Sequence, residues 1–266
     1  MTDFANRRDD LDDEEGIEID GFTLYPITMK HYTAFLAAKN ALLIRQGSLP
    51  AEYAVMRYLQ ALFAMDYDAV KKEQRPLGFL GSLMAFLALA LRYPVDAMVR
   101  SMKIKTAEND ARRLVSIEVR VGEVLLHLTP ATFDRMRPVL AEQNGLSLPD
   151  EAENIDLVEA EADIAASGAS GVVFDPRTEI ASVARDQRKR VSELMEYTIR
   201  EYTELKAAIE RDKLFTIYRT AELSGMVKFG KGNPVPSWCY DRKDAHSSMI
   251  AMADFMAGPG SVAAQH

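Results

Sequence analysis

Apolar and polar residues alternate in two short stretches of the chain, and each stretch contains a turn signal. In the first, Ile17–Tyr25, the alternation flanks Asp20-Gly21, the dipeptide most typical of a two-residue hairpin turn. In the second, Val115–Val121 is followed by Gly122-Glu123 and then by Val124–Leu128. A period of two indicates strands with one buried face, so we predict two antiparallel hairpins.

Elsewhere, apolar residues recur every three or four positions, which is the spacing of amphipathic helices. Thr129-Pro130 predicts the start of one helix, and Asn144-Gly145 predicts its end. One further helix is expected from Thr28 to about Gly47, and another from about Pro50, with an apolar stripe that begins at Val55. The remaining expected helices cover 78–92, 95–102, 178–213 as one long pattern, and 214–225.

Composition divides the chain into four regions. Residues 1–16 are acidic and nearly free of apolar side chains, which predicts a disordered tail. Residues 147–175 have the acidic and then Ala/Ser/Gly-rich composition of a flexible linker. We therefore predict an α+β, predominantly α-helical fold: an N-terminal helical domain with two small β-hairpins (17–146), and a C-terminal long-helix arm with a Pro/Trp-containing tail (176–266).

The formal net charge of −8 disfavours general binding to nucleic acid, because an acidic chain repels phosphate backbones. The basic stretch Arg185, Arg188, Lys189 and Arg190 leaves three interpretations open. It is a solvated helix face, a match for an acidic protein surface such as the chain's own linker, or the contact surface of a nucleic-acid-binding regulator.

Several features predict a cytoplasmic protein. The apolar run Leu77–Leu91 has about 15 residues, short of the roughly 20 that a membrane-spanning helix needs. Cys239 is the single cysteine, which favours a reducing compartment, and the acidic N-terminus does not have the pattern of a signal peptide. We therefore expect no membrane association.

Candidate chemistry is sparse. His31, His127, His246 and His266 are scattered without the spacing of metal ligands. Cys239 and His246 stand seven residues apart with no surrounding nucleophile motif, and Gly230-Lys231-Gly232 is too short for a phosphate loop. The sequence therefore predicts no catalytic residue, no cofactor and no metal, and favours a protein that binds other proteins.

The expected long helix and the tail supply candidate partner-binding residues. The apolar stripe of the helix passes through Met195 and Tyr202, and charged residues cover more than half of its circumference, so this stripe must meet another helix or another chain. The tail contains Trp238, Tyr240 and Phe255, and aromatic residues are common in interfaces. An alternative for Trp238 is packing onto the last helices of the same chain.

Three clusters of residues resemble a known family. They are Tyr25-Pro26-Ile27-Thr28-Met29-Lys30 with the following His31-Tyr32 and Phe35-Leu36; Leu42-Leu43-Ile44-Arg45-Gln46 with Leu49-Pro50-Ala51 and Tyr53–Met56; and Leu128-Thr129-Pro130 with Phe133, Met136-Arg137 and Gln143-Asn144-Gly145. Together with the 232–238 region, they resemble the tail assembly chaperones of tailed bacteriophages and prophages. The resemblance covers most of residues 17–150.

The resemblance implies a role without catalytic residues. Such chaperones bind the tape measure protein and keep it soluble in the host bacterial cytoplasm while tail tube protein polymerises around it. Self-association, and a frameshift junction within the 147–175 linker, are further expectations. The alternative is a structural component of the phage tail, neck or baseplate, which stays in the finished particle. The 13 methionines suit an adaptable binding surface.

Overall fold

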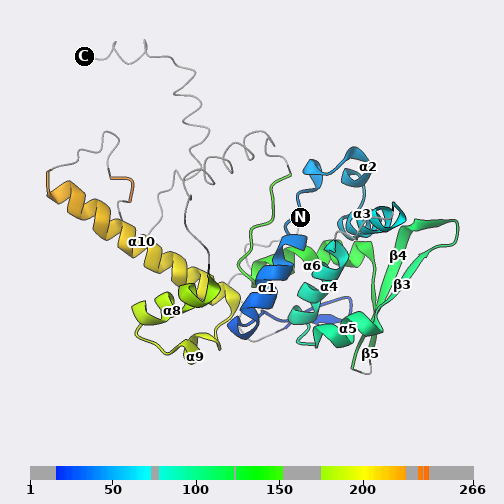
Figure 1. Ribbon diagram of the computed structural model, residues 1–266, viewed down its shortest axis with the longest axis horizontal. Coiled ribbons are helices and arrows are strands. Elements are labelled where there is room, and N and C mark those ends of the chain that lie inside the picture. Colours follow the sequence, from blue (N-terminus) through cyan, green and yellow to red (C-terminus); the bar gives the residue numbers. More distant parts are fainter. Residues whose placement is uncertain are drawn as a thin grey trace, which may run out of the picture. The chain divides into compact units, whose positions relative to one another are not determined.

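A computed structural model describes residues 16–72, 78–122, 124–151, 175–225, 233–235 and 237–239. The chain divides into two compact units, Met1–Thr203 and Glu204–His266. The described residues form a mostly helical α+β protein with a two-stranded and a three-stranded antiparallel sheet, which confirms the predicted fold class (Figure 1).

The first unit contains most of the secondary structure. In chain order its elements are β1 (Ile17–Ile19), β2 (Phe22–Leu24), η2 (Met29–His31), α1 (Tyr32–Ala38), η3 (Lys39–Ala41), η4 (Gln46–Ser48), α2 (Ala51–Ala54), α3 (Tyr58–Lys71), α4 (Phe79–Ala90), α5 (Val95–Ser101), β3 (Lys103–Ala107), β4 (Asp110–Val121), β5 (Val124–Leu128), α6 (Pro130–Gln143), α8 (Pro176–Asp186) and α9 (Val191–Leu194). Helix α10 (Ile199–Leu223) begins in the first unit and continues into the second.

Both predicted hairpins are present. β1 pairs with β2 through a turn in which Asp20 and Gly21 have φ angles of 51° and 81°, as the Asp-Gly signal requires. β4 pairs with β5, so the second hairpin is also confirmed. The prediction missed β3, which pairs with β4 at the edge of the same sheet. Its sequence, Lys-Ile-Lys-Thr-Ala, is mostly polar because the strand is largely exposed.

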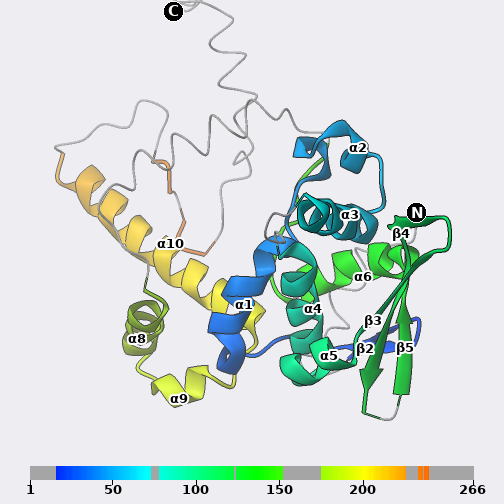
Figure 2. The ribbon, with the colours of Figure 1, turned by 45° about the vertical axis from the view of Figure 1, so that its right-hand side comes forward.

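Helix α4 is the centre of the hydrophobic core. It contacts α1, α3 and α5, and it lies among them in Figure 2. Leu83, Met84, Phe86 and Leu87 on this helix are almost completely buried, which explains why the sequence there is apolar on nearly every side. β4 in turn packs against α3, α5 and α6, so the three-stranded sheet has one face on the helical core.

The single helix expected from Thr28 to Gly47 is instead a series of short pieces: η2, α1, η3 and η4. Arg137 of α6 accounts for part of the interruption. Its guanidinium donates hydrogen bonds to the carbonyl oxygens of Leu42 (3.0 Å) and Ile44 (3.2 Å) and lies over the ring of Tyr58. A distant cation thus satisfies the backbone where the helix would have continued.

The next expected helix is also divided. α2 ends at Ala54, Arg57 has extended backbone angles, and α3 begins at Tyr58. Val55, placed by the sequence at the start of the apolar stripe, lies in the connection and is exposed. Met56, the next residue of the stripe, is partly buried against Tyr53 and Ala61, and the fully buried part of the stripe begins at Leu59.

The pattern over 178–213 forms three helices rather than one. Arg188 adopts a left-handed φ of 54° after α8, and the Lys189 amide bonds back to the carbonyl of Ala184, so the helix is closed without a glycine. α10 begins with a capping box, in which Thr198 Oγ1 accepts from the Glu201 amide and Glu201 Oε2 accepts from the Thr198 amide. This Thr-x-x-Glu signal is visible in the sequence and was overlooked.

Residues 176–203, which the sequence assigned to the C-terminal region, fall within the first unit. The Met29 amide bonds to the Tyr197 carbonyl, and the Ile199 amide bonds to the Ile27 carbonyl, both at 2.8 Å. Residues 152–174, most of the expected linker, and residues 1–15 of the expected tail lie outside the described residues. The linker and the disordered tail therefore stay predictions.

Candidate functional site

Tyr202, one of the predicted partner-binding residues, is part of the internal packing of the first unit. Its side chain is 1% exposed, and its ring lies 5.6 Å from that of Tyr32, centroid to centroid. The two hydroxyl groups donate to the same oxygen of Glu179, at 3.2 Å from Tyr202 and 2.9 Å from Tyr32. Tyr202 is thus covered by Tyr32 and Glu179 of the same chain.

The Tyr32–Glu179–Tyr202 cluster joins the starts of α1, α8 and α10. Burial is the largest cause that raises the pKa of each tyrosine above 10, and the nearby Glu179 carboxylate raises both further. Both hydroxyls therefore stay protonated at neutral pH and serve as hydrogen-bond donors. This arrangement holds helices together and presents no reactive group to solvent.

The other predicted partner-binding residues have different surroundings. Met195 is half-buried just after α9. Trp238 is 60% exposed, so its ring is accessible to a partner. Tyr240 and Phe255 lie outside the described residues, and their proposed role stays a prediction.

The second unit exposes apolar residues on α10 that the sequence analysis did not single out. Leu214 is 46% exposed and Ile217 is 62% exposed. Ala207 and Ala221 lie on the same side of the helix, at the alternating three- and four-residue spacing of a helix-pairing seam, and Glu210 occupies the seam position between Ala207 and Leu214. We call Leu214, Ile217 and the two alanines the 214/217 face. The 191–209 stripe does not lead to this face, because Leu214 is five residues beyond Ile209 and so lies on another side of the helix.

Charged side chains border the 214/217 face, and one of them, Glu210, stands within its row. Lys206 and Glu210 form an ion pair at 3.8 Å, and Arg219 and Glu222 form one at 2.7 Å. Exposed pairs of this kind contribute little to stability, but they keep the helix surface hydrated beside an apolar row. Apolar residues bordered by charges are typical of a helix that pairs reversibly with another helix.

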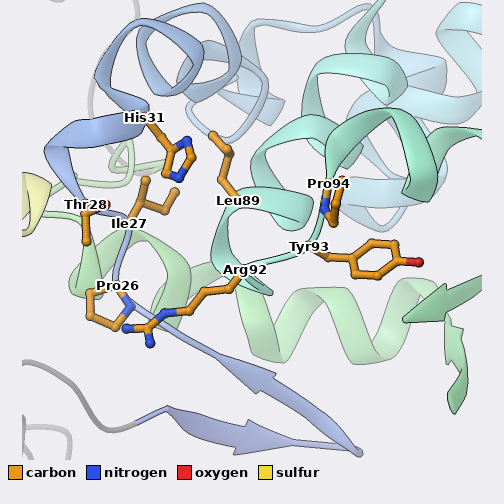
Figure 3. Close-up of a pocket in the computed structure, with 8 residues that line it drawn as sticks. All are labelled: Pro26, Ile27, Thr28, His31, Leu89, Arg92, Tyr93 and Pro94. Atoms are coloured by element: carbon orange, nitrogen blue, oxygen red, sulfur yellow. The ribbon is translucent and has the colours of Figure 1, made fainter. Parts of the chain in front are cut away.

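A pocket of about 360 Å³ lies in the first unit (Figure 3). Its lining comes from the segment after β2 and from the C-terminal end of α4, and consists of Pro26, Ile27, Thr28, His31, Leu89, Arg92, Tyr93 and Pro94. Arg92 extends across toward Pro26, whereas His31 lies beside Ile27 and Leu89. The sequence analysis listed His31 only as an isolated histidine, because the pocket joins segments about sixty residues apart.

The remaining candidates form no chemical site in the described part of the chain. No group of three or more His, Cys, Asp or Glu side chains there is placed to hold a metal ion. Cys239 is exposed, and His246 lies outside the described residues. Arg185, Arg188, Lys189 and Arg190 are exposed around the end of α8, which leaves their three interpretations open.

Among the described residues, no helix combines the length and apolar character needed to cross a membrane. Comparison of the chain with protein-family models, with curated proteins and with solved structures finds no match. Function is therefore inferred from the residues themselves and from their arrangement.

Proposed function

We propose that this chain is a phage tail assembly chaperone that binds the tape measure protein and keeps it soluble while the tail tube protein polymerises. The observation that carries the proposal is the 214/217 face, an exposed apolar row on a charged helix. A largely helical client offers apolar stripes of matching spacing, so pairing between helices would cover both surfaces. The clusters that resemble tail assembly chaperones supply the identity of the client.

The size of the face suits reversible binding. Complete burial of a leucine or isoleucine side chain contributes about 1.5 to 3 kcal/mol, and here about half of each side chain is already covered. One face would then contribute about 2 kcal/mol, enough only when several copies bind along one client. Weak contacts repeated along the client allow the tube subunits to displace the chaperone.

Co-expression tests this function. The tape measure protein from the same phage or prophage is produced with and without this chain, and its soluble fraction is measured. We expect most of it to be soluble only when the chain is present. Equal solubility in both cultures would contradict the proposal.

The structural alternative is a component of the tail, neck or baseplate, and mass spectrometry of purified virions separates it from the chaperone. A chaperone is released before the particle is complete, so we expect the chain to be absent from mature particles. Abundance comparable to that of known tail subunits would favour the structural role and overturn the chaperone proposal.

A further inference from the structure

The pocket beside Arg92 has walls that are already fixed by hydrogen bonds. The Tyr25 amide bonds to the Ala90 carbonyl at 2.8 Å, which ties the segment after β2 to the end of α4. Ile27 is held on both sides, because its amide donates to Asn144 Oδ1 and its carbonyl accepts from the Ile199 amide. The pocket is therefore formed without a ligand, and binding there would need little rearrangement of the backbone.

Three polar side chains of the pocket have no hydrogen-bond or ion-pair partner among the described residues: Thr28, His31 and Arg92. Thr28 precedes η2 but its side chain does not cap it. The guanidinium of Arg92 lies 4.3 Å from the centre of the Tyr25 ring, and this contact leaves its N–H donors free. A cation and two further polar groups thus border one hollow that contains no acidic side chain.

The backbone of Arg92 gives a second reason to examine this position. Its φ angle is 51°, and the Tyr93 amide bonds back to the Ala88 carbonyl to close α4. Glycine fits such a helix end without strain, so the arginine side chain is retained against a conformational cost. Arg188 closes α8 in the same conformation but is not part of the pocket, which makes it a matched control.

We propose that this pocket binds a carboxylate attached to an aliphatic group, with Arg92 as the residue that pairs with the carboxylate. Guanidinium groups bind carboxylates through two parallel hydrogen bonds. The side chains of Ile27 and Leu89 would contact the aliphatic part. A pocket of about 360 Å³ is in the lower range for small-molecule sites, which suits a small aliphatic acid or the end of a peptide.

Two sources have this chemistry, a free aliphatic acid and the C-terminal residue of a peptide. Four probes are titrated into the isotope-labelled full-length chain: 4-methylpentanoate, acetyl-Gly-Leu with a free carboxylate, and the amide of each. Binding is measured from the NMR chemical-shift changes of the protein. We expect saturable shifts with both acids and at least tenfold weaker binding of the amides, since each amide lacks the charge that pairs with Arg92. Tighter binding of the peptide acid assigns the site to a chain terminus, and equal or tighter binding of 4-methylpentanoate assigns it to a free acid.

Two variants distinguish the effect of the Arg92 side chain from the effect of its backbone conformation. Arg92→Gly removes the guanidinium and relieves the positive φ, so we expect a melting temperature close to that of the wild type and about tenfold weaker binding of the acids. Arg188→Gly gives the same backbone relief and should bind the acids as the wild type does. Three results would each overturn the proposal: equal binding of acids and amides, undiminished binding of the acids by Arg92→Gly, or no saturable binding of any probe by the wild type.

This pocket is separate in sequence from the 214/217 face, and the two proposals are tested by different measurements. Failure of the client to become soluble would leave the carboxylate site unaffected, and failure of the acids to bind would leave the chaperone proposal unaffected.

Discussion

The beginning and the end of α10 have apolar residues at helical spacing, yet their surroundings differ. Ile199 and Tyr202 are each 1% exposed, whereas Leu214 and Ile217 are about half exposed. At the beginning, Tyr32 and Glu179 contact the helix, and the capping box fixes its first turn. The comparison teaches that periodicity identifies residues on one face of a helix, while only the tertiary structure shows whether that face is covered.

The largest expected difference between the two ends is in stability. Tyr202→Ala removes a buried ring, so we expect the free energy of unfolding to fall by about 3 to 5 kcal/mol. Leu214→Ala, at a half-exposed position, should lower it by less than about 1 kcal/mol. Urea denaturation of both variants measures the contrast. Similar losses in the two variants would show that the two ends are equally packed.

Alkaline pH tests the buried end by another route. Tyr32 and Tyr202 have pKa values raised above 10 by burial and by Glu179, and burial raises the pKa of Tyr58 to about 12. Above pH 10 the unfolded chain loses these protons before the folded chain does. The stability that the three protonated tyrosines contribute is therefore fully present below pH 10 and is lost as pH rises toward about 12.

We therefore expect the urea midpoint to fall more steeply above pH 10 in the wild type than in Tyr202→Phe, which has one fewer titrating hydroxyl. The same slope in both proteins would mean that Tyr202 does not contribute to the alkaline loss. Leu214→Ala, which removes no titrating group, serves as the control and should keep the wild-type slope.

A smaller effect is expected at the start of α10. Thr198→Ala removes the hydroxyl that caps the helix and should lower the free energy of unfolding by about 1 kcal/mol. Glu201→Gln retains an acceptor for the Thr198 amide, so it should have a smaller effect and provides the matched control. Urea denaturation distinguishes them, and an unchanged midpoint for Thr198→Ala would contradict the role of the cap.

The smallest effect on stability is expected at the 214/217 face. The double variant Leu214→Gln/Ile217→Gln replaces two exposed apolar side chains with good helix formers of similar length. The free energy of unfolding should therefore change by less than about 1 kcal/mol. Circular dichroism during thermal melting checks this. A large loss of stability would show that these residues are packed within the chain and are not available to a client.

Local signals predicted much of the fold. Asp20-Gly21 placed the first hairpin, and Thr129-Pro130 with Gly145 placed α6, because each turn or cap depends on residues adjacent in the sequence. The sequence did not predict the break after Leu42, where Arg137 from α6 binds the backbone carbonyl, or strand β3, which has little apolar pattern to detect. The break after α8 was missed because an arginine occupies the position where glycine is usual.

The candidate sites were harder to predict than the fold. The helical spacing suggested that Tyr202 contacts a partner, because nothing local in the sequence indicates that Tyr32 covers Tyr202. The pocket was missed for the same reason, since it combines the segment around Ile27 with the end of α4. Trp238 is exposed as its proposed role requires, but exposure does not identify a partner.

The central claim is that the 214/217 face binds the tape measure protein, and a three-way co-expression experiment tests it most directly. The soluble fraction of the tape measure protein is measured with the wild-type chain, with Leu214→Gln/Ile217→Gln, and with Leu223→Gln. Leu223 is 72% exposed but lies nine residues from Leu214, about two and a half turns, and so on the opposite side of α10. We predict that the double variant loses most of the solubilising activity and that Leu223→Gln retains it. Full activity of the double variant, produced at wild-type levels, would contradict the account.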